Sequence, residues 1–79
     1  MIDFTIVSAV ENVKVIAVKR RTRNFARLNR VFGRGRWRKL KGTAHVKLPS
    51  GRVRFAEVNW YEAYCLGVSD MKIKLPFLD

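Results

Sequence analysis

The sequence is poor in the residues that build metal centres and crosslinks. Its 79 residues include one cysteine, Cys65, and one histidine, His45. A single cysteine excludes a disulfide within the chain, and these two side chains are too few for a Cys/His zinc cluster. We therefore expect neither a metal nor another cofactor. The lack of disulfides is typical of proteins in a reducing compartment.

Long hydrophobic runs are missing as well. No stretch approaches the roughly 18–20 apolar residues that span a bilayer. The first 18 residues carry Asp3, Glu11 and Lys14, and they lack the basic start and continuous apolar core of a signal peptide. We expect a cytoplasmic protein without membrane contact, folded as a single domain over residues 1–79.

Acidic residues are scarce, and the charge is unevenly distributed. The chain has 17 Lys and Arg against six Asp and Glu, a formal net charge of +11. Residues 19–41 contain eleven of the cations and no acid, whereas the rest of the chain contains six cations and six acids. Clustered like charges repel one another and oppose folding. A phosphate backbone relieves that repulsion, so this segment predicts binding to nucleic acid.

Arginine outnumbers lysine eight to three in residues 19–41, and guanidinium forks match phosphate geometry. The candidate nucleic-acid-binding residues are cations of this segment, together with two aromatic residues for base stacking. They are Arg20, Arg23, Arg27, Arg30, Arg34, Arg36, Trp37, Arg38, Lys39, Lys41 and Tyr64. RNA is favoured over DNA because stacking needs splayed, single-stranded bases, for which Tyr61 is a further candidate.

Residues 22–32 have the pattern of a helix. Thr22 is a favourable N-cap, and Phe25, Leu28 and Phe32 recur at helical spacing before a glycine. On a helical wheel these three apolar residues fall within about 60° of one another, and the arginines fall nearly opposite. The spacing predicts a basic amphipathic helix whose apolar face packs on a sheet.

The rest of the chain is rich in β-branched residues. Strands are expected over residues 4–7, 13–18, 37–40, 44–48, 52–61 and 71–75. Residues 8–18 also fit a helix, and the Leu-Pro-Ser-Gly sequence at 48–51 predicts a turn. Phe55 and Trp60 have opposite parity, so a β-bulge is expected between them, near residues 56–57. The predicted fold class is α+β, with one helix (about 22–32) packed on an antiparallel sheet of about four strands.

Part of the chain resembles a known group of proteins. The relevant segments are Trp37–Lys39, Val46–Gly51, Ala56–Ala63 and Met71–Lys74. Their pattern resembles small bacterial toxin-like ribonucleases of the barnase, colicin and RelE type, with a hairpin, a His-Trp-Tyr-Glu-Ala-His segment and a closing Phe-Lys-Ile-Lys strand. The resemblance spans residues 37–75 and implies an RNA substrate cleaved without metal. Both histidines of the pattern are absent, and Asn59 and Tyr64 stand in their places.

The resemblance also implies catalytic candidates. Tyr61 and Glu62 match its pattern, as do Lys72 and Lys74. Tyr61, Glu62 and Lys72, with His45 and Arg54, form a candidate set for proton transfer and phosphate stabilisation. An asparagine in place of a histidine does not exchange protons near neutral pH, which argues against activity. His45 substitutes for it only where the fold brings His45 beside Glu62.

Three functions are consistent with the sequence. The leading hypothesis is a small, non-catalytic domain that binds RNA, or DNA, through the phosphates. The first alternative is a metal-independent endoribonuclease. The second is an interaction module for an acidic protein partner or a second copy of the chain, because so small a domain leaves much of its surface unburied. Convergence of His45 and Glu62 in one groove favours an enzyme, and their separation onto opposite faces leaves a binding module.

Overall fold

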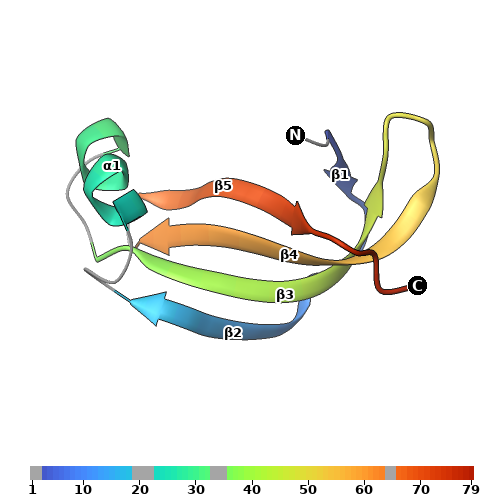
Figure 1. The fold of residues 1–79 in the computed structure, drawn as a ribbon, viewed down its shortest axis with the longest axis horizontal. Helices are drawn as coiled ribbons and strands as arrows, with labels where there is room; N and C mark the ends of the chain where they lie inside the picture. The colour runs from blue at the N-terminus through green and yellow to red at the C-terminus, as the bar shows by residue number, and fades with distance from the viewer. Residues whose placement is uncertain (1–2, 19–22, 33–35, 64–65) are drawn as a thin grey trace.

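The computed structural model describes residues 3–18, 23–32, 36–63 and 66–79. In chain order the elements are β1 (Thr5–Ile6), β2 (Glu11–Val18), α1 (Arg23–Phe32), β3 (Arg38–Lys47), β4 (Val53–Ala63) and β5 (Gly67–Lys74). All strand pairs are antiparallel. β3, β4 and β5 are consecutive neighbours, and β1 and β2 both pair with the other edge of β3. Figure 1 shows that the resulting sheet is curled.

The predicted α+β fold class, with a basic helix packed on the sheet, is wrong. More than half of the described residues lie in strands, and the helix α1 has ten residues. α1 lies at one end of the sheet instead of across it (Figure 1). Within the described part of the chain, no helix has the length and apolar character needed to cross a membrane.

The main core explains why no helix covers the sheet. One face of the sheet, here named the core face, carries the buried side chains of this core. They are Leu40, Val46, Ala56, Val58 and Trp60. Phe4 and Val10 from the N-terminal segment, and Phe77 after β5, pack against them. These flanking segments occupy the core face where the sequence analysis expected a helix to pack, and α1 instead packs on the opposite face at one end of the sheet.

The segment after β5 is held in place by polar contacts as well. The backbone N–H of Leu78 donates to the carbonyl of Phe55 at 2.7 Å. Arg54 lies over the ring of Phe77, 4.3 Å from its centroid, and its Nε donates to Asp79 Oδ1 at 2.9 Å. The hydrogen bond from Arg54, helped by one from the backbone of Phe55, lowers the pKa of the Asp79 carboxyl.

A second, smaller core cluster lies on the opposite face, at the end of the sheet near α1. It contains Leu28 of α1, Trp37, Tyr61 and Ala63, with Leu66 packed against it. Leu28 is fully buried there. Among the described side chains of the helix, Leu28 therefore docks it beside the start of β3 and the last residues of β4.

The strand registers correct one further expectation and decide between two alternatives. β3 and β4 pair without interruption from Val53 to Glu62, so the bulge expected near residues 56–57 is absent. The register shift instead lies between β4 and β5, opposite Trp60, where Asp70 adopts a φ of 58°. β4 stays regular because alternate residues of the strand point to opposite faces, and each face has its own core cluster. Residues 8–18, which fitted either a helix or a strand, contain β2.

Candidate nucleic-acid interface

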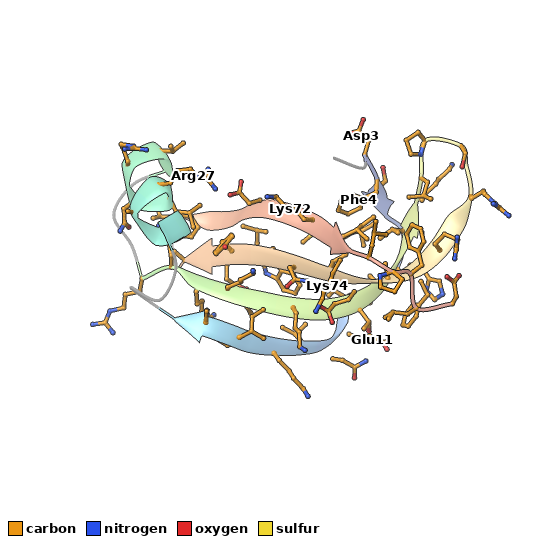
Figure 2. All side chains as sticks on the ribbon, in the orientation of Figure 1. Asp3, Phe4, Glu11, Arg27, Lys72 and Lys74 are labelled. Atoms are coloured by element: carbon orange, nitrogen blue, oxygen red, sulfur yellow. The ribbon has the colours of Figure 1, made fainter. Side chains whose placement is uncertain are left out.

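The surface opposite the core face is rich in lysine. Directly paired residues of neighbouring strands point to the same side of a sheet, and alternate residues of a strand share a side. These rules place one group of lysines together, here named the lysine face. Its members are Lys14, Lys39, Lys41, Lys72 and Lys74. Lys47 has the same orientation but lies apart from them, at the last residue of β3. They come from three strands, and Figure 2 shows Lys72 and Lys74 along β5.

One row of this face crosses four strands. Lys14 of β2 pairs with Lys41 of β3, which pairs with Asn59 of β4, which pairs with Lys72 of β5. Neighbouring strands are about 4.8 Å apart, so the row is about 14 Å wide. Lys14 and Lys41 stand directly opposite each other, an arrangement of like charges that destabilises a sheet. Among the described residues, no acid forms an ion pair with either of them or with Lys72.

The neighbouring rows modify this positive charge. The ammonium of Lys39 lies 5.8 Å from the centre of the Tyr61 ring, a cation–π contact. On the other side, Glu11 and Glu57 both flank Thr43 in one row, and Lys74 Nζ lies 3.8 Å from Glu57 Oε2. The lysine face is therefore basic in its centre and mixed in charge toward the β3–β4 turn.

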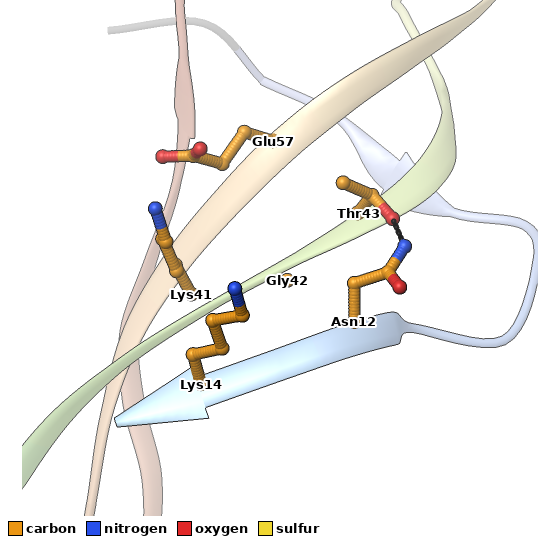
Figure 3. Close-up of a pocket in the computed structure, with 6 residues that line it drawn as sticks. All are labelled: Asn12, Lys14, Lys41, Gly42, Thr43 and Glu57. Atoms are coloured by element: carbon orange, nitrogen blue, oxygen red, sulfur yellow. Dashed lines mark hydrogen bonds between the residues drawn. The ribbon is translucent and has the colours of Figure 1, made fainter. Parts of the chain in front are cut away.

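A pocket of about 180 Å³ opens on this face (Figure 3). Its lining residues are Asn12, Lys14, Lys41, Gly42, Thr43 and Glu57. Asn12 Nδ2 donates to Thr43 Oγ1 at 3.1 Å. Glu57 Oε2 accepts from Nδ2 of Asn59 at 3.1 Å. The pocket is thus lined by two ammonium groups, two neutral polar side chains and one carboxylate that a hydrogen bond holds in place.

The structure places the predicted binding residues in different environments. Four of them cannot be placed: Arg20, Arg34 and Tyr64 lie outside the described residues, as does the side chain of Arg23. Lys39 and Lys41 belong to the lysine face. Arg30 and Arg36 are exposed, the first on α1 and the second just before β3.

The remaining predicted residues make contacts within the fold. Arg27 forms an ion pair with Asp70, and Arg38 Nη2 lies 3.4 Å from Glu62 Oε2. Trp37 is only 2% exposed, so stacking on a base requires it to leave its buried cluster. Tyr61, at 5% exposed, is equally enclosed. These residues hold α1 and the strand ends together.

Three lysines of the face are not among the predicted nucleic-acid-binding residues, although Lys72 is one of the catalytic candidates. Lys14, Lys72 and Lys74 lie outside residues 19–41, in the part of the chain without net charge. The alternation of apolar and basic residues in 71–75 indicated that Lys72 and Lys74 point away from the core. The pattern contains no signal that sets them on the same face as Lys41, because strand order and register decide that.

The catalytic candidates do not meet. His45 pairs with Phe55, which lies seven residues from Glu62 along β4, about 23 Å at 3.3 Å per residue. The odd spacing also places His45 and Glu62 on opposite faces. Arg54 is engaged with Asp79 on the core-face side. Tyr61 and Lys72 lie on the lysine face, without His45 or Glu62 beside them.

Glu62 is occupied by neighbours of its own. Its Oε1 accepts a hydrogen bond from Trp60 Nε1 at 3.2 Å, and its Oε2 faces Arg38. In the described ranges, no three His, Cys, Asp or Glu side chains gather as metal ligands would. The geometry therefore gives the ribonuclease hypothesis no assembled set of proton-transfer groups.

Comparison of the chain with protein-family models, with curated proteins and with solved structures finds no match. The resemblance of residues 37–75 to toxin-like ribonucleases accordingly rests on the sequence pattern alone. The lysine face is the feature of this molecule from which a function is inferred.

Proposed function

We propose that the chain is a nucleic-acid-binding domain, with RNA as the favoured ligand. It contacts phosphates through the lysine face and the adjoining cations of residues 19–41. The observation that carries this proposal is the pairing of Lys14 with Lys41, neither of which forms an ion pair with a described acid. The pair destabilises the free sheet, and a phosphate between the two ammonium groups removes that repulsion.

The arginine-rich segment adjoins the lysine face. Lys39 and Lys41 belong to both, and the exposed Arg36 lies two residues before the start of β3. Arg30 is exposed on α1, whose Leu28 packs against Tyr61 at the end of this face. A bound strand that crosses the central row can therefore extend toward the end of the sheet near which these arginines lie.

Binding of a fluorescein-labelled uridine 12-mer, followed by anisotropy across a salt series, tests the proposal. Affinity should fall steeply with salt, with a log–log slope of about −0.7 per phosphate contacted. The double variant Lys14→Gln/Lys41→Gln should bind at least about tenfold more weakly, with a slope shallower by about 1.4. The control Lys47→Gln/Arg52→Gln removes two exposed cations outside the row and should weaken binding much less.

Three results would contradict the proposal. The first is the absence of binding, or an affinity that does not change with salt. The second is an equal loss in the two double variants, which would make net charge alone responsible. The third is binding of polyglutamate as tightly as the 12-mer, which would favour an acidic protein partner.

A further inference from the structure

We infer that the pocket in Figure 3 holds one ribonucleotide unit of the bound RNA, with its phosphate on Lys14 and Lys41 and its ribose 2′-hydroxyl on Glu57. This inference rests on the proposed function and adds discrimination of RNA from DNA to it. The feature that needs explaining is the carboxylate. A site for a phosphate alone gains nothing from an acid among its lysines, because the acid repels the ligand.

The phosphate side of the pocket is formed by β2 and β3. Figure 3 shows the side chains of Lys14 and Lys41 extending from paired positions on the same side of the sheet, with the end of Lys41 directed toward Glu57 and Asn12 directed toward Thr43. The hydroxyl of Thr43 adds a further polar group at 3.1 Å from the Asn12 amide. Ammonium, amide and hydroxyl groups are the side chains that hold phosphate and sugar oxygens in nucleic-acid complexes.

The sugar side of the pocket is the Glu57 carboxylate. Asn59 Nδ2 donates to Oε2, and Lys74 Nζ lies 3.8 Å from the same oxygen. Oε1 accepts no hydrogen bond from a described residue. The carboxylate is thereby fixed in place, with one oxygen left to accept a neutral O–H or N–H donor from a ligand.

The chemistry of the lining identifies the donor. None of the six described lining residues is aromatic, so the pocket offers no surface on which a base stacks. Lys41 and Glu57 are diagonal neighbours across β3 and β4, about 7–8 Å apart at Cα, which leaves room for a sugar between their charged groups. Within a sugar–phosphate backbone the neutral hydroxyl is the ribose 2′-OH, the group that DNA lacks.

The test compares four uridine 12-mers that differ only in the sugar. They are RNA, 2′-O-methyl RNA, 2′-fluoro RNA and deoxyuridine DNA. On the native protein, RNA should bind about fivefold more tightly than the other three, the effect of one hydrogen bond to a carboxylate in an open pocket. This comparison uses only the native protein, so a folding defect of a variant cannot affect the measured affinities.

Two matched variants locate the effect. In Glu57→Gln the donation from Asn59 keeps the amide oxygen at the Oε2 position, so an NH₂ group replaces the accepting Oε1 and the preference for RNA should fall to about one. Glu11→Gln removes the same charge from the same row but lies outside the pocket lining, and it should keep the fivefold preference. Circular dichroism confirms that both variants are folded.

The results separate this inference from the proposed function. Equal affinity of the native protein for RNA and DNA 12-mers, or an unchanged preference in Glu57→Gln, overturns the sugar assignment while salt-dependent binding persists. Absence of binding to every 12-mer overturns the proposed function itself. Competition by uridine 3′-monophosphate near the Kd of the RNA 12-mer assigns the pocket to a free nucleotide and overturns its assignment to RNA.

Discussion

Gly42 is a residue of β3 against which the N-terminal segment packs closely. A Cβ at this position would lie 2.6 Å from Val10 Cγ1, 3.0 Å from the carbonyl oxygen of Glu11 and 3.3 Å from Trp60 Cη2. Real Cβ atoms do not approach other heavy atoms as closely as the first of these distances. The missing side chain therefore allows Val10 to pack on the core face and sets β2 beside Lys41.

We expect Gly42→Ala to lower the free energy of unfolding by about 1–3 kcal/mol, because the added methyl group overpacks the core. Urea denaturation measures the loss. In the double variant with Val10→Ala the nearest clashing atom is gone, so the two losses should sum to more than the loss of the double variant. Strictly additive losses would show that the contact with Val10 is not the cause.

At the scale of elements, contacts of Leu28 and Arg27 attach α1 to the sheet. Leu28 is buried among Trp37, Tyr61 and Ala63, and Arg27 pairs with Asp70 of β5. A helix of ten residues is too short to be stable in water by itself. The position of α1 therefore depends on these contacts more than on its own helical propensity.

Leu28→Ala should weaken the docking of α1 by about 2–5 kcal/mol, since it leaves a cavity in a small cluster. Hydrogen exchange should show faster exchange of the α1 amides, while the amides between β3 and β4 remain protected. Val31→Ala is the control, because Val31 lies on the same helix and is 58% exposed. Equal loss of protection in β3 and β4 would mean that the two core clusters unfold as one unit.

The local features of these elements were largely predictable. The apolar spacing indicated a helix close to Arg23–Phe32, and the turn at 48–51 is confirmed by the hydrogen bond from Gly51 N to Leu48 O at 2.9 Å. The packing of the helix was not predictable, because amphipathicity shows which side is buried and not against what. On the core face of the sheet, Phe4, Val10 and Phe77 pack where the helix was expected to pack.

At the scale of the whole molecule, the sequence located the excess charge but not the surface that it forms. Residues 19–41 contribute Lys39 and Lys41 to the lysine face. Lys14 and Lys72 lie beside them on other strands, although they are far away in the sequence. The alternation of apolar and basic residues in 71–75 predicted that Lys72 points outward. The alternation does not determine which residues pair across neighbouring strands, because the register shifts between β2 and β3 and between β4 and β5 depend on three-dimensional packing.

This arrangement predicts that salt has opposite effects on folding and on binding. Raising NaCl from about 0.1 M to about 1 M shortens the Debye length from about 10 Å to about 3 Å. Screening then weakens the repulsion between Lys14 and Lys41, so the free energy of unfolding should rise. RNA affinity should fall over the same range, because counterions released into a more concentrated salt solution gain less entropy. Urea denaturation and anisotropy titrations at matched salt concentrations measure the two trends.

Lys14→Glu separates this effect from general screening, because it sets an acid opposite Lys41. At about 0.1 M salt the variant should be more stable than the native chain by about 0.2–1 kcal/mol, yet bind RNA more weakly. Its stability should also gain less from added salt. Lys47→Glu is the matched control, since Lys47 pairs with Thr5 and Val53 and faces no like charge. A Lys14→Glu variant less stable than the Lys47→Glu variant would show that the paired lysines do not oppose folding. In that case, relief of their repulsion could not contribute to the binding of a phosphate.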